Sequence, residues 1–358
     1  MTALSIGDQA PWFMAQALEG NANYAFDSVA GRVVLLLFGG SMAWPAPAQA
    51  LRIVDRHRAL FDDHRACFFG ISTDPDDVAQ GRIAQKLPGI RWFLDHDRAI
   101  SSTYGAASEE GDGRVRYAPY FLLLDHRLRV AGRFSVDDAE AAMAATARLL
   151  AAGCEVQAAP VLIVPRIFEP EVCRYLIDLY DRSGGTESGF MQERGGMTVP
   201  VIDHGFKRRS DHMIEDGELL KALRARLSGR LLPEIERAFQ YRVTRVERWM
   251  VACYDSEAGG FFNAHRDNTT RGTAHRQFAC TINLNAEEFE GGELRFPEYG
   301  ARSYRAPTGG AVVFSCSLLH EAMPVTKGRR YAFLPFFYDD AGAALRERNA
   351  QFLQARAD

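Results

Sequence analysis

The chain has 358 residues, of which 47% are hydrophobic and 25% charged, and its formal net charge is −4. This length exceeds one ordinary hydrophobic core and predicts two domains. The slight acidic excess provides no positive field for polyanions, which excludes nucleic acid as a general partner. The first residues lack the basic and apolar regions of a signal peptide, and no run reaches the roughly 20 apolar residues of a membrane span. We therefore expect a cytoplasmic protein with no membrane partner.

The cysteines predict no disulfide framework and no zinc or iron–sulfur site. None of the six belongs to a Cys-x-x-Cys pair, and most lie in apolar, strand-like runs. We expect buried, reduced thiols at these positions. The six are Cys67, Cys154, Cys173, Cys253, Cys280 and Cys316.

The first 150 residues alternate strand-like and helical patterns. Short apolar runs predict strands over 32–38, 66–72 and 91–94, followed by a hairpin of 120–124 and 128–134. Helical patterns cover 47–61, 76–86 and 136–152. Strands that alternate with helices and end in a hairpin indicate an α/β sandwich.

This part of the chain resembles the thioredoxin fold, and within it the peroxiredoxin-like proteins. The resemblance rests on Gly-Asp-Gln-Ala-Pro at 7–11, the first strand, Gly-Ile-Ser-Thr-Asp at 70–74, and Pro119, where the family has a cis-proline. Peroxiredoxins carry a nucleophilic cysteine after the first strand, yet residues 39–51 contain none, and Cys67 lies in a predicted core strand. We therefore expect a domain that docks a partner protein, forms a homodimer or presents a substrate, without peroxidase activity.

A Gly- and Pro-containing linker over 151–160 divides the chain into domains at 1–153 and 160–342, with a terminal helix over 343–358. The second domain opens with a strand at 161–164 and a helix over 168–182, and a second helix is predicted over 216–240. Between these helices, the glycine-rich residues 183–210 are either a surface loop or a lid. Their end, Lys-Arg-Arg at 207–209, is either a solvated face or a contact for an acidic partner.

Short strands with turn signals between them continue to residue 338. They are predicted over 246–254, 261–267, 277–284, 293–296, 311–315 and 330–338. Six or more such strands indicate a double-sheet jelly roll.

The triplet His265-Arg266-Asp267 within these strands is a candidate metal site. Side chains two residues apart on a strand project from one face, about 6.6 Å apart along the strand, so an imidazole and a carboxylate can converge on one ion. His320 is well placed to supply a second imidazole. Two histidines and one carboxylate on one face of an octahedral ion form the facial triad of Fe(II) oxygenases.

Residues 160–340 resemble the prolyl 4-hydroxylase-like dioxygenases that depend on 2-oxoglutarate and Fe(II). The matching stretches include Cys-Tyr at 253–254, His-Arg-Asp at 265–267, Phe-Glu-Gly-Gly-Glu-Leu at 289–294, Pro-Thr-Gly-Gly-Ala at 307–311 and residues 319–330. The resemblance implies a double-stranded β-helix whose metal ligands are His265, Asp267 and His320.

The resemblance also implies roles for residues that bind the cosubstrate. Arg330 is expected to bind the distal carboxylate of 2-oxoglutarate, because a guanidinium matches a carboxylate with two parallel bonds. Tyr254 is expected to bind the same carboxylate or to be a core aromatic residue. Asn283 is a further pocket candidate, since it is polar within an apolar run.

The chemistry implied by the family is hydroxylation of an aliphatic carbon by O2, with succinate and CO2 as coproducts and with ascorbate as an additional ligand. A peptidyl substrate such as proline is expected first, and a free amino acid or small metabolite second. Asp267 favours hydroxylation, because related halogenases lack this carboxylate. The competing hypothesis is a scaffold that senses oxygen or iron and binds a partner through the redox-inactive first domain.

Overall fold

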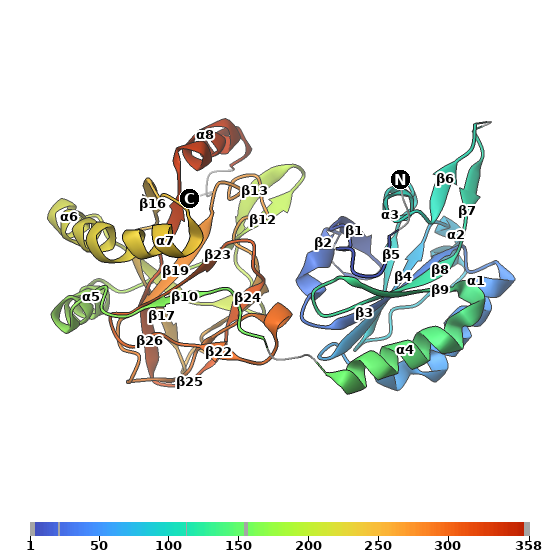
Figure 1. The fold of residues 1–358 in the computed structure, drawn as a ribbon, viewed down its shortest axis with the longest axis horizontal. Coiled ribbons are helices and arrows are strands. Elements are labelled where there is room, and N and C mark those ends of the chain that lie inside the picture. The colour runs from blue at the N-terminus through green and yellow to red at the C-terminus, as the bar shows by residue number, and fades with distance from the viewer. Residues whose placement is uncertain (1–3, 21, 112, 154–156, 354–358) are drawn as a thin grey trace. The chain divides into compact units, whose positions relative to one another are not determined.

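The computed structural model describes residues 4–20, 22–111, 113–153 and 157–353, which form two compact units (Figure 1). The first unit consists of Met1–Val156 and Pro297–Gly300, and the second of Gln157–Phe296 and Ala301–Asp358. Part of the predicted linker, residues 154–156 with Cys154, lies outside the described residues. No helix within the described ranges combines the length and apolar character that a membrane span requires.

A seven-stranded sheet forms the centre of the first unit, in the order β2-β1-β5-β4-β3-β8-β9. Strands β3, β4 and β5 are parallel, and β8 and β9 form an antiparallel hairpin. β3 and β4 are buried along their whole length, as their continuous apolar runs require. The bounds are Met14–Ala17 (β1), Tyr24–Ala25 (β2), Val33–Gly40 (β3), Ala66–Ser72 (β4), Ile90–Leu94 (β5), Tyr120–Leu124 (β8) and Val130–Ser135 (β9), and a separate hairpin joins Ala107–Glu109 (β6) to Val115–Tyr117 (β7).

Two helices, α1 (Pro45–Arg56) and α4 (Ala139–Ala152), pack side by side on one face of this sheet (Figure 1). Ile53 of α1 and Met143 of α4 share a buried cluster with Leu35 of β3. Two short helices, α2 (Pro75–Ala79) and α3 (Ala99–Thr103), complete the unit. Strands, hairpin and helices thus form the predicted α/β arrangement.

Two details of the first unit differ from the sequence prediction. The helix predicted over 76–86 is wrong in its length, because α2 ends at Ala79 and Gly81 adopts φ +63°, a left-handed conformation that ends a helix readily. Pro119 does not follow a cis bond; among the described residues, the cis peptide is Leu87–Pro88.

Two antiparallel sheets form the second unit, the larger in the order β10-β23-β19-β26-β17-β15-β11 and the smaller in the order β14-β18-β24-β21-β22. Strands β16 and β27 pair with each other, and β27 joins the larger sheet through β19. Tyr254 of β17 and Phe262 of β18 belong to one buried cluster, so the two sheets face each other.

The strands of the larger sheet are Leu162–Val164 (β10), Thr186–Glu187 (β11), Ser210–Met213 (β15), Arg245–Glu247 (β16), Met250–Asp255 (β17), Phe278–Asn283 (β19), Ala311–Ser315 (β23), Arg329–Phe333 (β26) and Phe336–Tyr338 (β27). Those of the smaller sheet are Lys207–Arg208 (β14), Phe261–His265 (β18), Leu294–Arg295 (β21), Ser303–Tyr304 (β22) and His320–Ala322 (β24). One further hairpin pairs Phe190–Arg194 (β12) with Met197–Val201 (β13). A separate two-stranded sheet pairs Glu290–Gly291 (β20) with Val325–Lys327 (β25), which are far apart in the chain.

Helices α5 (Pro170–Ser183), α6 (Gly217–Arg226) and α7 (Leu232–Phe239) cover the outer face of the larger sheet. Leu176 and Ile235 from these helices pack with Cys253 and Phe333 of the sheet. The helix predicted over 216–240 is divided by a π-helical turn, Leu227–Leu231. Pro233 accounts for this division, because it has no N–H for an intrahelical bond and its ring crowds the preceding turn.

Other predicted elements of the second unit are also divided or shifted. Residues 183–210 are not a plain loop, because they contain four short strands, β11 to β14. The strand predicted over 330–338 is interrupted at Leu334 and Pro335, where proline cannot donate to the ladder. The terminal helix α8 runs from Asp340 to Asn349, earlier than predicted, and residues 354–358 lie outside the described part.

Candidate metal centre

Strands β18 and β24 bring His265, Asp267 and His320 together. His265 and His320 are opposite each other in the antiparallel pair, and Asp267 lies two residues beyond His265. The distance from His265 Nε2 to Asp267 Oδ1 is 3.6 Å, and that from His320 Nε2 to Asp267 Oδ2 is 3.3 Å. One ligand atom from each of the three residues lies within 4.8 Å of the others, which is close enough for a single metal ion.

Backbone carbonyl groups fix the orientation of both imidazoles. The Nδ1 atom of His265 is 2.7 Å from the Asn263 carbonyl oxygen, and that of His320 is 3.0 Å from the Leu318 carbonyl oxygen. A proton on each Nδ1 satisfies these bonds and leaves each Nε2 lone pair directed at Asp267. The tautomer that binds a metal is therefore favoured before any metal is present.

Electrostatics favour a neutral His265 and an ionised Asp267 at neutral pH. Burial, with the neighbouring His320, lowers the pKa of His265 to about 4. Burial alone would raise the pKa of Asp267, but the two imidazoles hold it well below its usual range. Imidazole and carboxylate ligands fit a divalent ion such as Fe(II), and the candidate ligand cluster found among the described residues contains no cysteine to favour zinc.

Aromatic rings pack against both histidines. The Phe262 ring stacks on His265 with centroids 3.5 Å apart, and Phe314 lies 4.5 Å from His320. Phe262 and Phe314 also line a cavity of about 70 Å³ that contains the three candidate ligands. The rings therefore limit the rotamers of both histidines and the access of water to them.

The predicted cosubstrate arginine lines the same cavity. Arg330 of β26 is 3% exposed, and its Nη2 donates to Thr281 Oγ1 over 2.9 Å. Its neighbour Arg329 points to the other side of the strand, where it pairs with Asp255 at 2.8 Å and is half exposed. A buried guanidinium with one neutral hydroxyl partner keeps donors free for a carboxylate.

Tyr254 lies in the cavity, whereas Asn283 is not among the residues that line it. Tyr254 is opposite Arg330 across the β17–β26 pair, and the guanidinium carbon of Arg330 is 5.1 Å from the centre of its ring. The Asn283 amide donates instead to the Ala306 carbonyl over 2.7 Å. Sequence reasoning missed Thr281, whose hydroxyl contacts Arg330. A polar residue two positions before Asn283, on the same face of the strand, was the available signal.

The basic residues at 207–209 do not form a solvated face. Lys207 and Arg209 are 4% and 8% exposed, and they alternate with the exposed Arg208. Arg209 binds Asp211 with two bonds of 2.7 and 2.8 Å, and its Nη1 donates to the Tyr254 hydroxyl over 3.4 Å. Strands β14 and β15 carry this segment from the smaller sheet to the larger one, so alternate side chains point between the sheets.

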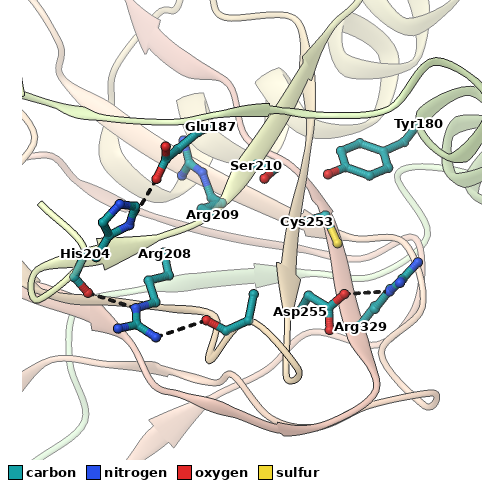
Figure 2. Close-up of a pocket in the computed structure, with 10 residues that line it drawn as sticks. Tyr180, Glu187, His204, Arg208, Arg209, Ser210, Cys253, Asp255 and Arg329 are labelled. Carbon is teal, nitrogen blue, oxygen red and sulfur yellow. Dashed lines mark hydrogen bonds and ion pairs between the residues drawn. The ribbon is translucent and has the colours of Figure 1, made fainter. Parts of the chain in front are cut away.

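A second pocket, of about 570 Å³, lies on the other side of β17, where Cys253 rather than Tyr254 contributes to its wall (Figure 2). Its charged groups have protein partners, and all but the Asp211 partner of Arg209 are drawn in Figure 2. His204 pairs with Glu187 at 3.0 Å, and Arg208 donates to the His204 and Ala258 carbonyl groups. These pairs leave no strong binding group, and we assign the pocket no role.

The first unit has no thiol suited to nucleophilic attack among its described residues. Cys67 is buried in β4, and burial raises its pKa to about 12. In the turn after β3, Ser41 donates to Asp74 over 2.5 Å, and the buried Asp77 accepts from the Met42 N–H. The described cysteines are all buried and free: Cys67, Cys173, Cys253, Cys280 and Cys316.

A His–Asp–His cluster between two facing antiparallel sheets is the donor set typical of non-haem Fe(II) oxygenases. Comparison with known proteins agrees. Residues 249–338 match the model of the 2OG-Fe(II) oxygenase superfamily. Residues 6–144 match the AhpC/TSA family, which agrees with the peroxiredoxin-like resemblance of the first unit.

Individual relatives match only a part of the second unit. A PKHD-type hydroxylase of Synechococcus sp. (strain JA-2-3B'a(2-13)) is 34% identical over 89 residues, and one of Paracoccus denitrificans (strain Pd 1222) is 38% identical over 84. These matches cover 23% and 21% of this chain, and 39% and 37% of the relatives. The chain thus spans about two fifths of the length of these proteins.

Solved structures with some likeness include a prolyl hydroxylase from Trichoplax adhaerens in complex with a hypoxia inducible factor oxygen degradation domain peptide fragment. It has a TM-score of 0.43 and 20% identity, over 52% of this chain and 86% of that one. A Pseudomonas putida prolyl-4-hydroxylase has a TM-score of 0.37 and 18% identity, over 50% and 92% of the two chains.

Proposed function

We propose that the second unit is a double-stranded β-helix dioxygenase that uses Fe(II), 2-oxoglutarate and O2 to hydroxylate an aliphatic carbon. The observation that carries the proposal is the convergence of His265, Asp267 and His320 in one cavity with Arg330. The match to the 2OG-Fe(II) oxygenase superfamily over 249–338 supports the same assignment.

In this proposal, His265, Asp267 and His320 hold the metal through two Nε2 atoms and a carboxylate oxygen. Fe(II), when bound with 2-oxoglutarate, supplies an oxidant made from O2 that inserts one oxygen atom into a C–H bond, while the other oxygen atom enters succinate and CO2 is released. The carbonyl partners of the two Nδ1 atoms keep the imidazoles aligned without rotation. Phe262, Phe314 and Leu294 line the site and exclude water.

Arg330 and Tyr254 are proposed to hold the distal carboxylate of 2-oxoglutarate. The Tyr254 hydroxyl accepts a bond from Arg209 and therefore has its own proton free to donate. Thr281 accepts from Arg330 and fixes the plane of its guanidinium. These contacts orient the cosubstrate without taking part in proton transfer.

Succinate release by anaerobically purified protein given Fe(II), 2-oxoglutarate and O2 tests the proposal, with and without ascorbate. Succinate that disappears in the His320→Ala variant would support the dioxygenase. Binding of both iron and 2-oxoglutarate without succinate from any offered substrate would favour the oxygen- or iron-sensing scaffold. The expected peptidyl substrate, the ascorbate requirement and a homodimer through the first unit stay predictions.

A further inference from the structure

Arg248 lines the metal cavity and has no strong partner in the described part of the chain. It lies between β16 and β17, and its guanidinium forms no hydrogen bond there. Its nearest carboxylate oxygen, Asp211 Oδ2, is 3.6 Å from Nη2, and Asp211 already makes two bonds to Arg209. Arg248 therefore retains nearly all of its donors.

The backbone presents Arg248 in an unusual conformation. Its φ is +68°, in the left-handed region that residues other than glycine rarely adopt. The flanking residues fix this turn, because Glu247 pairs with Arg276 at 2.6 Å and the Trp249 ring packs against Phe333. Such strain persists where the surroundings enforce it and is typical of binding sites.

The charges of the cavity leave one positive charge without a counterpart. Arg209, Arg248 and Arg330 line it, Asp267 is the carboxylate in its wall, and Asp211 behind the wall binds Arg209. Two other nearby carboxylates add no net charge, because Glu247 pairs with Arg276 and Glu293 pairs with Arg305. The buried Lys207 behind this wall adds no positive charge at neutral pH, since burial and nearby Arg209 lower its pKa to about 5. A divalent metal ion and the dianion 2-oxoglutarate would cancel each other. The remaining positive charge therefore fits a substrate with one negative charge.

The wall beside Arg248 is apolar. Leu334, Pro335 and Phe336 line the cavity where the last long strand is interrupted, and the guanidinium carbon of Arg248 is 5.5 Å from the centre of the Phe336 ring. A charged group beside apolar side chains suits a ligand that has an aliphatic body and one charged end.

We propose that Arg248 binds a carboxylate of the substrate, so that the enzyme acts on an aliphatic carboxylic acid rather than on a neutral peptide segment. The inference rests on the proposed function of the same site. The carboxylate belongs either to a free amino acid or related small acid, or to a peptide with a terminal or side-chain carboxylate.

A direct test measures the binding of trifluoroacetate by fluorine NMR to protein loaded with Zn(II), as an inert substitute for Fe(II), and saturated with 2-oxoglutarate. Trifluoroacetamide has the same shape without the charge and is the matched probe. We expect the native protein to bind the acid and not the amide. Loss of one charge-assisted contact in Arg248→Gln should weaken trifluoroacetate binding about tenfold to a hundredfold.

Arg242→Gln is the control variant, because Arg242 is exposed on the surface of the same unit and its loss should leave trifluoroacetate binding unchanged. Equal binding of acid and amide, or unchanged binding in Arg248→Gln, would overturn the inference. Titration with 2-oxoglutarate separates the two proposals. If the native protein does not bind 2-oxoglutarate, the proposed function fails, whereas the trifluoroacetate result still decides the role of Arg248.

Turnover identifies the source of the carboxylate. Free amino acids, peptides that end in a carboxylate, peptides with acidic side chains, and the corresponding amides are compared for their stimulation of succinate release. We expect stimulation by acids only, and a KM for the best acid that rises in Arg248→Gln more than kcat falls. Stimulation by amides as strong as by the acids would refute the inference.

Discussion

Replacement of Arg330 by methionine should weaken 2-oxoglutarate binding strongly and leave metal binding intact. Arg330 is 3% exposed, so solvent does not screen its interaction with a carboxylate. Two charge-assisted hydrogen bonds of about 1.5 to 3 kcal/mol each correspond to a loss of roughly 3 to 6 kcal/mol, or about a hundredfold to ten-thousandfold in affinity. Metal binding should persist, because the three candidate ligands lie on β18, just beyond it and on β24.

Arg329→Met is the matched control for this experiment. Arg329 is adjacent in sequence and equal in charge, but it pairs with Asp255 on the other side of the strand and is half exposed. Its replacement should change the affinity for 2-oxoglutarate by less than about threefold, as is usual for an exposed ion pair. Calorimetric titration of the Zn(II)-loaded variants measures both effects. An affinity in Arg330→Met within threefold of the native value would show that another cation holds the cosubstrate.

Three further predictions concern buried ionisable groups. Burial and Arg209 lower the pKa of Lys207 in the folded state to about 5, below its ordinary value of 10.5. Between these two pH values the unfolded state binds a proton that the folded state does not, so the free energy of unfolding falls as the pH falls. In the native protein, Lys207 should make the free energy of unfolding rise with pH by up to about 1.4 kcal/mol per pH unit, and Lys207→Met should remove this contribution. Urea unfolding at pH 6 and pH 9 measures it, and an equal pH dependence in the native protein and the variant would contradict the assignment. Glu247→Gln should lower the free energy of unfolding by about 3 to 5 kcal/mol, since Glu247 is the buried partner of His275 and Arg276; a loss below 1 kcal/mol in the same assay would refute this. Cys67→Ser should leave hydroperoxide turnover at the background of the native protein, and a drop from a measurable native rate would restore a peroxidase role.

The sequence predicted most accurately the elements whose local pattern does not depend on contacts with distant parts of the chain. The strands over 66–72 and 311–315 have the predicted bounds, because a continuous apolar run buried on both faces leaves little freedom in where a strand begins and ends. The spacing of His265 and Asp267 placed both side chains near one point, because this depends only on the two-residue period of a strand. The approach of His320 required the pairing of β24 with β18.

Local pattern failed where long-range contacts compete with it. Glycine and charged residues dominate 183–210 and predicted a surface loop or a lid, yet backbone pairing of strands gives this segment extended structure. The helix over 216–240 kept its apolar period through Pro233, and only the structure shows the π-helical turn that accommodates the missing N–H.

By itself, then, the sequence predicted two domains, a strand-rich second half and the residue types of a candidate facial triad. Only the tertiary structure decided which side of each strand faces the cavity. The alternation of side chains along a strand predicts that Lys207, Arg209 and Asp211 share a face. The register of β14 and β15 with their neighbouring strands decides that this face points between the two sheets. The same holds for Thr281 on β19. For Arg248, a left-handed turn between two paired strands sets the direction of the side chain, and a pattern of residue types contains no information about that turn.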